Sequence, residues 1–427
     1  MNTIEKIYEL YKKAYTVTTD SRKISKDCVF VALKGEHFDG NDFALPVAEK
    51  GVAACVIADR KDLPKQERLF VVDDSLKALQ ELAKQHREKL GLPVIGITGT
   101  NGKTTTKELV SAVLSKKYNI FFTQGNFNNQ LGVPLTLLSI KPGTEMAVVE
   151  MGASHPGDID ELTGLGKPNY GIITNIGRAH LRDFGGYEGV IKTKNEMYQY
   201  IGAHKGLLFV NRDNDLLMNL ARNINKVTYG TLDNADVKGK MLSANPYLSV
   251  EWNNKHIDTQ LVGDYNFENV MAAICIGTYF KVDADDIVDA LSGYCPTNNR
   301  SQVIETGKNR VVMDAYNANP TSMSYAIKNF RNICKNDNLL ILGDMRELGD
   351  ESEQEHKTII ALLKELKFKK VFLVGPEFSK VSKNSGFSTF TNVEELAQYL
   401  LQHSVSSLDI LVKGSNGIHL NKIIDSL

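Results

Sequence analysis

The stretch that decides the fold is Val94-Ile95-Gly96-Ile97-Thr98-Gly99-Thr100-Asn101-Gly102-Lys103-Thr104-Thr105-Thr106. Its apolar start predicts a buried strand, its Gly-Thr-Asn-Gly segment a tight turn, and the apolar spacing from Leu109 to Leu114 a helix. A strand, a glycine loop and a helix in this order aim backbone N–H groups at a polyphosphate. The sequence therefore predicts an ATP-binding loop made of Gly99, Thr100, Asn101, Gly102, Lys103, Thr104 and Thr105.

The loop departs from the commonest phosphate-binding pattern at one position. That pattern has a glycine where this chain has Ile97, so Gly99 supplies the turn instead. Lys103 would neutralise the outer phosphates, and the Thr104 hydroxyl would join the coordination shell of Mg²⁺. The alternative is a strand–turn–helix connection that contains a lysine by chance. The Gly-Lys-Thr sequence after a buried strand favours the phosphate loop.

Length and composition indicate an ordinary soluble protein of several domains. The chain has 427 residues, a hydrophobic fraction of 42%, a charged fraction of 24% and a net charge of −1. Without a block of like charges, nucleic acid is not expected as a partner. No apolar run approaches the ~20 residues that span a bilayer, and the N-terminus predicts a charged amphipathic helix rather than a signal peptide. The five cysteines lack metal-ligand spacing. We therefore expect a cytoplasmic monomer that binds small molecules.

Alternating strand and helix patterns predict an α/β protein with three domains. Residues 1–90 form a small α/β domain that ends in a helix at Ser75–Leu90. Residues 91–297 form a central ATP-binding domain with a mainly parallel sheet and an antiparallel insertion at Val237–Gln260. Residues 298–427 form a Rossmann-like domain. Its strands are predicted from four apolar runs closed by turns: Val311–Met313, Leu339–Leu342, Val371–Val374 and Ile410–Val412.

Two polar side chains of the central domain follow apolar runs. Glu150 follows Ala147–Val149, and His180 lies shortly after Gly171–Ile176. In open parallel sheets, ligands bind at the carboxyl ends of the strands, where the phosphate loop also lies. A carboxylate and an imidazole there can hold or orient Mg²⁺ beside a nucleotide. The alternatives are a solvated strand end for Glu150 and a hydrogen-bonded loop histidine for His180.

Lys194 interrupts an apolar stripe at helical spacing. The stripe consists of Val190, Ile191, Met197, Tyr198 and Ile201. A lysine in this place either snorkels past its neighbours or takes part in chemistry, because burial raises the neutral fraction of the amine. The pattern alone favours snorkelling.

Three asparagine-rich segments have the amide groups that suit a polar ligand, although plain turns explain them equally well. The segments are Gln124–Pro134, Gly263–Asn269 and Asp314–Pro320. Arg300, between the two larger domains, is a weaker signal for a phosphate contact.

Taken together, these segments resemble the muramyl ligase family, ATP-dependent enzymes that extend the peptide of the bacterial cell-wall precursor. The features shared with the wider family are Gly99–Thr104, Glu150, His180 and Lys194. A narrower resemblance, to members that join D-alanyl-D-alanine to UDP-N-acetylmuramoyl-tripeptide, is carried by Gly125–Pro134, Tyr316–Pro320 and Gly343–Gly349. Thr19–Arg22 and Leu33–Gly40 are similar to the family's UDP-binding segments, although His37 and Asn41 replace its usual Arg and His.

The resemblance implies a role for each domain and for single residues. The first domain would bind the UDP-sugar, the central one ATP, and the third the dipeptide. Lys194 matches the family lysine that reacts with CO₂ to form a carbamate. Metal ligation is implied for Thr104, Glu150, His180 and carbamylated Lys194, and catalysis for Lys103, Lys194, His180 and Arg300. Further nucleotide contacts are implied for Asn266, Asn269, Arg300, Asp314 and Asn317. Substrate contacts are implied for Ser21, Arg22, Lys34, Phe38, Asp39, Asn126, Asn128 and Asn129.

The implied activity is ATP-driven amide formation through an acyl phosphate in peptidoglycan precursor synthesis, with Mg²⁺ as cofactor. One alternative is a ligase similar to folylpolyglutamate synthase, against which the Asn-rich loop and the UDP-like segments argue. The other is a non-catalytic protein that switches on ATP.

Overall fold

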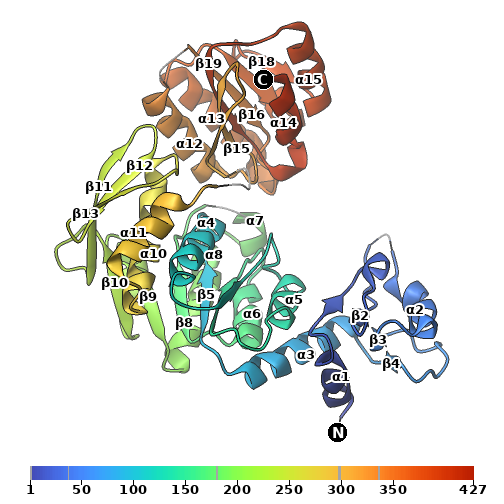
Figure 1. Cartoon of the computed structure of the whole chain (residues 1–427). Helices are drawn as coiled ribbons and strands as arrows, with labels where there is room; N and C mark the ends of the chain where they lie inside the picture. Colours follow the sequence, from blue (N-terminus) through green and yellow to red (C-terminus); the bar gives the residue numbers. More distant parts are fainter. Residues whose placement is uncertain (1, 37, 179–180, 297–299, 335–336) are drawn as a thin grey trace.

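The computed structural model describes residues 2–36, 38–178, 181–296, 300–334 and 337–427, which form three β-sheets with helices around them (Figure 1). The predicted three-domain α/β architecture is confirmed, and each sheet lies within one of the three predicted segments. The limits at residues 90 and 297 remain predictions. Among the described residues, no helix is both long and apolar enough to cross a membrane.

The first domain is built on a small parallel sheet. Its elements are α1 (Thr3–Tyr11), β1 (Val17–Thr18), β2 (Val29–Val31), α2 (Ala44–Lys50), β3 (Cys55–Ala58), β4 (Leu69–Val71) and α3 (Ser75–Leu90). The strands follow one another in the order β1-β2-β3-β4. Helix α3 begins after Asp74, whose side chain accepts a hydrogen bond from Lys77 N, and ends before the left-handed Gly91. These two caps explain why the predicted helix at Ser75–Leu90 is observed.

The central domain has a nine-stranded sheet in the order β13-β12-β11-β10-β9-β8-β5-β7-β6. Its strands are β5 (Val94–Thr98), β6 (Ile120–Phe122), β7 (Met146–Glu150), β8 (Tyr170–Ile173), β9 (Leu207–Asn211), β10 (Lys226–Gly230), β11 (Val237–Ala244), β12 (Leu248–Trp252) and β13 (Lys255–Asp258). Its helices are α4 (Lys103–Leu114), α5 (Gly132–Leu138), α6 (Asp158–Gly166), α7 (Leu181–Phe184), α8 (Tyr187–Ala203), α9 (Asp215–Leu220), α10 (Phe267–Tyr279) and α11 (Ala284–Gly293).

The order of the central strands places the phosphate loop beside two other strand ends. Strand β5, which precedes the loop, pairs in parallel with β7 on one side and β8 on the other. The carboxyl ends of the three strands therefore open at one edge, which is where ligands bind in such sheets. Strands β11, β12 and β13 are antiparallel, which confirms the predicted insertion, and β11 attaches it to β10.

The C-terminal domain has a six-stranded sheet in the order β14-β15-β19-β16-β17-β18, parallel except for β14. Its strands are β14 (Gln302–Glu305), β15 (Arg310–Asp314), β16 (Asp337–Gly343), β17 (Val371–Val374), β18 (Ser388–Phe390) and β19 (Leu408–Lys413). Its helices are α12 (Pro320–Ile333), α13 (Ser352–Glu365), α14 (Pro376–Val381) and α15 (Val393–Gln402). The four apolar runs predicted as strands lie in β15, β16, β17 and β19.

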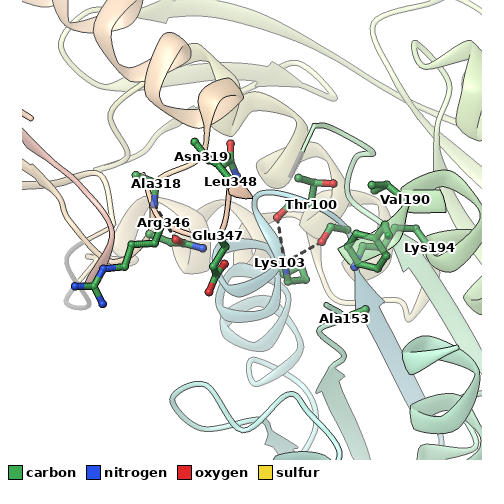
Figure 2. Close-up of a pocket in the computed structure, with 13 residues that line it drawn as sticks. Thr100, Lys103, Ala153, Val190, Lys194, Ala318, Asn319, Arg346, Glu347 and Leu348 are labelled. Carbon is green, nitrogen blue, oxygen red and sulfur yellow. Dashed lines mark hydrogen bonds between the residues drawn. The ribbon is translucent and has the colours of Figure 1, made fainter. Parts of the chain in front are cut away.

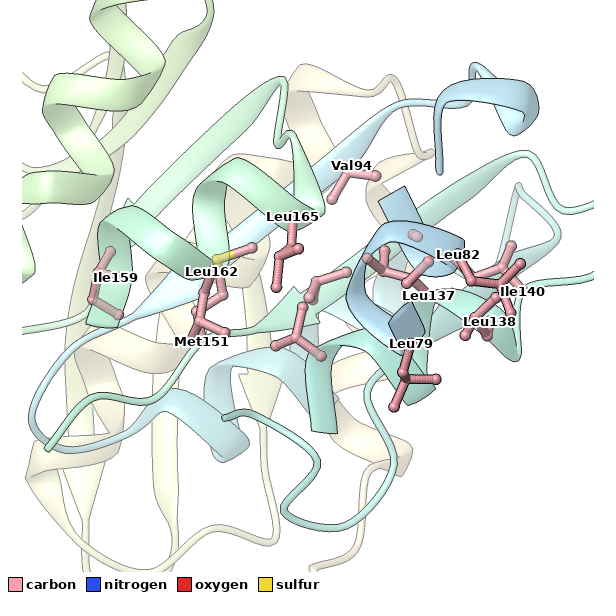
Figure 3. Packing of buried hydrophobic residues seen from close by; sticks show 14 of the residues in the cluster. Leu79, Leu82, Val94, Leu137, Leu138, Ile140, Met151, Ile159, Leu162 and Leu165 are labelled. Carbon is pink, nitrogen blue, oxygen red and sulfur yellow. The ribbon is translucent and has the colours of Figure 1, made fainter. Parts of the chain in front are cut away.

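Helix α3 joins the first domain to the central one through a shared hydrophobic core. Its Leu79 and Leu82 are fully buried in one cluster with Leu137 of α5 and Leu162 of α6 (Figure 3). Near the end of the helix, Arg87 Nε donates a hydrogen bond of 2.9 Å to the carbonyl oxygen of Gly166. The two domains are thus connected by continuous apolar packing as well as by the chain.

Candidate functional site

The phosphate loop is held in shape by the segment that follows β8. Thr100 N donates to Asn175 O at 2.9 Å, and Asn101 N donates to Asn175 Oδ1 at 3.0 Å. The Thr174 hydroxyl donates to Asn101 O at 2.6 Å. Contacts between two neighbouring strand ends therefore fix the conformation of the loop.

Two glycines allow the loop to approach its neighbours closely. Gly99 has φ 144°, and a Cβ there would lie 2.0 Å from Thr174 Oγ1. Gly102 has φ 79°, and a Cβ there would lie 2.6 Å from Asn269 Oδ1. Any larger residue would meet both an unfavourable backbone conformation and a clash.

Lys103 is the first residue of α4, and its side chain folds back over the loop. Its Nζ donates to Gly99 O at 2.8 Å and to Thr100 O at 3.1 Å (Figure 2). Burial lowers the pKa of Lys103, the charge of Arg300 lowers it further, and Glu150 raises it. Thr105 lies in the first turn of the same helix.

Glu150, Thr104 and Asn128 form a buried oxygen-rich cluster next to the loop. Glu150, the last residue of β7, is only 2% exposed, and its Oε2 accepts a hydrogen bond of 2.9 Å from the Thr104 hydroxyl. Its Oε1 accepts one of 2.7 Å from Asn128 Nδ2. Among the described residues this carboxylate forms no ion pair. A buried carboxylate without a direct ion pair is costly, so the cluster is suited to receive a cation.

Lys194 lies on the buried face of α8 and lines the same cavity as Lys103 (Figure 2). It is 3% exposed, and its Nζ lies 5.7 Å from the centre of the Phe184 ring. Burial, and then the charge of Lys103, lower the pKa of Lys194 to about 7. The low exposure excludes snorkelling to the surface, the interpretation that the sequence pattern alone favoured.

The cavity lies between the central and C-terminal domains and is small, about 50 Å³. The central domain contributes Gly99, Thr100, Lys103 and Lys194, and the C-terminal domain contributes residues 317–319 and 346–348. A hydrogen bond of 2.8 Å from Asn319 Nδ2 to Asn101 Oδ1 connects the C-terminal domain to the phosphate loop directly. Asn319 also caps α12, because its Oδ1 accepts from Ser322 N.

Arg300 lies near this cavity with unused hydrogen-bonding capacity. Its guanidinium carbon lies 3.8 Å from the centre of the Tyr316 ring, and its buried Nε has no hydrogen-bond partner among the described residues. Asp314 is held by Lys413, whose Nζ donates to Asp314 Oδ2 at 2.5 Å. The same Nζ donates to Asn317 O at 3.3 Å and so fixes the turn that lines the cavity.

Asn266 and Asn269, expected at the nucleotide, lie buried behind the loop. Asn269 Nδ2 donates to Asn266 Oδ1 at 2.9 Å, and Asn269 Oδ1 accepts from the Thr106 hydroxyl at 3.0 Å. Asn269 thus connects α10 to the phosphate-loop helix α4. In the Asn-rich segment, Asn126 is exposed, and Asn129 Oδ1 accepts from Gly132 N at the start of α5.

The residues expected to bind the UDP-sugar form a second group on the first domain, at the carboxyl ends of β1 and β2. Ser21 and Arg22 follow β1, and Arg22 is paired with Asp20, whose pKa it lowers to about 2. Lys34 and Asp39 follow β2 and pair through their backbones in an isolated antiparallel β-bridge. The ring of the exposed Phe38 stacks on that of Phe43, with the ring centres 5.6 Å apart. None of these residues lines the cavity between the other two domains.

Two histidines named in the sequence analysis, His180 and His37, lie outside the described residues. Asn41 is 2% exposed and donates to Asp39 and Asp59 at 2.8 Å each. Asn175 was not foreseen, although it follows β8 as Glu150 ends β7, so the same strand-end argument could have found it.

Lys107 was also not foreseen. It is 1% exposed, and its Nζ donates to Thr123 O at 2.7 Å. The Thr123 hydroxyl in turn accepts from Glu150 N at 3.0 Å. Its position one turn after Lys103 was the available signal.

Comparison with known families and proteins covers nearly the whole chain. Residues 13–87 match the Mur ligase family catalytic domain, residues 97–277 the Mur ligase middle domain, and residues 299–416 the Mur ligase glutamate ligase domain. The UDP-N-acetylmuramoyl-tripeptide–D-alanyl-D-alanine ligase of Bacillus subtilis (strain 168) is 37% identical, over 96% of this chain and 92% of the relative.

Solved structures agree with this match. A crystal structure of MurF from Acinetobacter baumannii superposes with a TM-score of 0.86 at 30% identity, over 96% of this chain and 92% of that one. MurF ligase from Thermotoga maritima in complex with ADP superposes with a TM-score of 0.84 at 27% identity, over 100% of this chain and 98% of that one. With matches in all three domains, this chain belongs to the Mur ligase family.

Proposed function

We propose that this chain is an ADP-forming ligase that joins D-alanyl-D-alanine to UDP-N-acetylmuramoyl-tripeptide in peptidoglycan precursor synthesis. The observation that carries the proposal is one cavity in which the phosphate loop and Lys194 face residues 317–319 and 346–348 of the C-terminal domain. The full-length similarity to the Bacillus subtilis ligase supports these substrates over those of folylpolyglutamate synthase. A protein that only switches on ATP would not need a C-terminal domain that lines the cavity opposite the phosphate loop.

ATP would bind with its phosphates on the loop. The backbone N–H groups at the start of α4 and the Lys103 ammonium supply positive charge there. Lys103 would exchange its bonds to Gly99 O and Thr100 O for phosphate oxygens. Arg300, with its unpartnered Nε, would steady phosphate charge from the domain boundary. Asp314 and Asn317 would lie on the far side of the nucleotide, with Asn266 and Asn269 behind the loop. The ADP held by the Thermotoga maritima structure supports this assignment.

The cluster around Glu150 fits Mg²⁺. The Thr104 hydroxyl and the Glu150 carboxylate are oxygen ligands 2.9 Å apart, and no group of three or more His, Cys, Asp or Glu among the described residues forms a metal cage. A site with few protein ligands is typical of Mg²⁺, because this ion usually takes its remaining ligands from phosphate and water. When bound, Mg²⁺ would offset the negative charge of the phosphates. His180 and carbamylated Lys194 would support a second ion.

Lys194 is suited to form the carbamate. With a pKa of about 7 instead of 10.5, about half of its amine is neutral at pH 7, against roughly one in 2,500 in water. The neutral nitrogen attacks the carbon of CO₂ and loses a proton, which turns a buried cation into an anion beside the cationic Lys103. The anion would thereby be paired, whereas the cation that it replaces forms no ion pair with any residue that the structure describes.

The chemistry requires two displacements. The terminal carboxylate of the tripeptide attacks the γ-phosphorus of ATP, and the bond to the bridging oxygen breaks to release ADP. The dipeptide amine then attacks the carbonyl carbon of the acyl phosphate, loses a proton, and inorganic phosphate leaves. Lys103 and Arg300 would stabilise the charge that develops on the transferred group. Ser21, Arg22, Lys34, Phe38 and Asp39 would hold the UDP-sugar, and Asn126, Asn128 and Asn129 the peptide end.

We further propose that the chain acts as a monomer in the cytoplasm. The residues assigned to the three substrates all belong to one chain, so no second copy is needed to complete the site. Light scattering coupled to size-exclusion chromatography should give the mass of one chain, 47.4 kDa, and a mass of two chains would contradict the monomer.

The test is release of ADP and phosphate. Both should require the UDP-tripeptide, and stoichiometric amide product should form only when D-alanyl-D-alanine is added. Equal ADP release without either substrate would contradict the proposal and favour an ATP switch. Product formation from a folate and glutamate, with none from the UDP-tripeptide, would favour the other ligase.

A further inference from the structure

Asn319 connects the C-terminal domain to the phosphate loop. It lines the cavity together with Thr100 and Lys103 (Figure 2), and its Nδ2 donates a hydrogen bond of 2.8 Å to Asn101 Oδ1. Beside this bond, Gly177 of the central domain lies close to α12, because a Cβ on Gly177 would lie 3.7 Å from Thr321 Oγ1. The start of α12 is therefore in direct contact with the phosphate loop and with the segment that supports it.

Helix α12 fixes which end of the Asn319 amide faces the loop. Asn319 Oδ1 accepts a hydrogen bond of 2.8 Å from the backbone N of Ser322, an atom that can only donate. The backbone N of Asn319 donates to Ser322 Oγ at 3.1 Å, which completes a capping box. The oxygen of the Asn319 amide is thus committed to the helix, and the amino group is the end that remains for the loop.

The backbone of Asn101 is fully engaged, so only its side chain can respond to Asn319. Its N donates to Asn175 Oδ1 at 3.0 Å, and its O accepts from the Thr174 hydroxyl at 2.6 Å and from Asn175 Nδ2 at 3.1 Å. Its side-chain oxygen accepts from Asn319. Asn101 Nδ2 forms no hydrogen bond with any residue that the structure describes. It is therefore a spare donor on the loop that would hold the phosphates.

We propose that Asn319 is a positioning residue that orients the Asn101 amide for phosphoryl transfer. The inference rests on the proposed function. While Asn319 holds Asn101 Oδ1, Asn101 Nδ2 is available to donate to an oxygen of the ATP phosphates, a hydrogen bond to an anion. Without Asn319 the amide can rotate, and its oxygen, which phosphate repels, can take the place of the donor. The loop is then complete only while the C-terminal domain rests on it.

The contribution of Asn319 belongs to the steps after ATP binding. The cavity of about 50 Å³ is too small for ATP, so ATP would bind while the two domains are further apart and Asn319 is away from the loop. The bond to Asn101 would form when the domains close over the bound nucleotide. Loss of the bond should therefore lower kcat and leave the KM for ATP nearly unchanged.

Asn319→Ser tests this role without removing the helix cap. Serine caps a helix as well as asparagine does, but it is shorter and lacks the amino group. We expect kcat to fall by about 10- to 100-fold, as for the loss of a hydrogen bond to a charged group, with the KM for ATP within about twofold of wild type. The matched control is Asn392→Ser, because Asn392 caps α15 by accepting from Glu395 N at 2.9 Å and does not line the cavity. It should keep the wild-type kcat, and both variants should unfold at the same temperature as wild type.

A double-mutant cycle and a binding measurement show whether Asn319 acts through Asn101. In Asn101→Ala, kcat should be low already, and adding Asn319→Ser should lower it no further, because the amide to be oriented is gone. Isothermal titration calorimetry with ADP and aluminium fluoride, in the presence of the UDP-tripeptide, measures affinity for a mimic of the transferred phosphoryl group. Asn319→Ser should bind this mimic about 10- to 100-fold more weakly than wild type and bind ADP alone equally well.

The outcomes distinguish the inference from the proposed function. A wild-type protein that makes no amide product overturns the proposed function and the inference with it. An active wild-type protein whose Asn319→Ser variant keeps the wild-type kcat overturns the inference alone. So does an equal loss of kcat in Asn392→Ser, which would trace the effect to helix capping. A full further loss on adding Asn319→Ser to Asn101→Ala also overturns it, because Asn319 would then act without Asn101.

Discussion

At the scale of single residues, Lys194 shows how a position in the fold changes the chemistry of a side chain. The same lysine in water would be a cation, and in this structure burial and the charge of Lys103 bring its pKa to about 7. The apolar stripe of its helix was visible in the sequence. Which charges face it was not, because Lys103 comes from another element.

Lys194→Met should lower activity, and it should also remove a pH-dependent cost to stability. Because its pKa is lower in the folded chain, the unfolded chain holds the proton more tightly between pH 7 and 10.5. The cost of burying the cation is therefore full below pH 7 and disappears as the pH rises to 10.5. We expect the variant to be more stable than wild type by a few kcal/mol at pH 7 in CO₂-free buffer and equally stable near pH 10.5.

Denaturant unfolding at the two pH values measures the stability difference, and a difference that does not shrink as the pH rises contradicts the expectation. The kcat of the variant should fall by about 10- to 100-fold or more, since the group would no longer support the metal. In the wild-type protein, ¹³C-labelled CO₂ should give a carbamate signal that Lys194→Met lacks.

Gly99→Ala tests the fit of the phosphate loop. A Cβ there combines φ 144° with an approach of 2.0 Å to Thr174 Oγ1, so the loop must move. We expect a loss of about 1–3 kcal/mol of stability and a large rise in the KM for ATP. Gly164→Ala is the matched control, because nothing lies within 4 Å of its Cβ and it sits in α6. It should gain up to about 1 kcal/mol. Thermal unfolding and ATP titration measure both, and an unaffected KM in Gly99→Ala would be inconsistent with this loop binding the phosphates.

At the scale of elements, α3 has a role that its own sequence does not reveal. Its apolar stripe predicts a buried face, but the stripe is the same whichever partner covers it. The structure places that face against α5 and α6, so the helix of the first domain is also part of the core of the central one.

Leu79→Ala should therefore destabilise both domains together. Removing a fully buried leucine costs about 2–5 kcal/mol. Glu81→Ala, on the exposed face of the same helix, should change stability by less than about 0.5 kcal/mol. Hydrogen exchange followed by mass spectrometry would show raised exchange in α1, α5 and α6 of Leu79→Ala. Raised exchange confined to residues of the first domain would mean that the two domains unfold independently.

At the scale of the whole molecule, the cavity that contains Lys103 and Lys194 is smaller than its proposed ligands. The cavity between the central and C-terminal domains measures about 50 Å³, whereas small-molecule sites occupy roughly 300–1,000 Å³. The bond between Asn319 and Asn101 holds the domains together across this cavity. We therefore expect the C-terminal domain to move relative to the central one when ATP binds and when products leave.

If this movement limits turnover, kcat should fall as solvent viscosity rises. Sucrose at increasing concentration is expected to lower the wild-type kcat nearly in proportion to the relative viscosity. Glu150→Gln, slowed in the chemical steps, should lose this dependence. A wild-type kcat that ignores viscosity would show that chemistry, and not domain movement, limits the rate.

The sequence by itself determined the local features of this protein. Periodicity and caps specify α3, apolar runs specify β15, β16, β17 and β19, and the Gly-Thr-Asn-Gly-Lys-Thr segment specifies the phosphate loop, because each depends on residues close together in the chain. The strand-end rule also placed Glu150 beside that loop. Only the tertiary structure decided that Asn319 donates to Asn101, that the charge of Lys103 adds to burial in lowering the pKa of Lys194, and that Arg346 donates to Gly417 O. Those contacts join residues far apart in the chain, and nothing in one side chain specifies which distant element will face it.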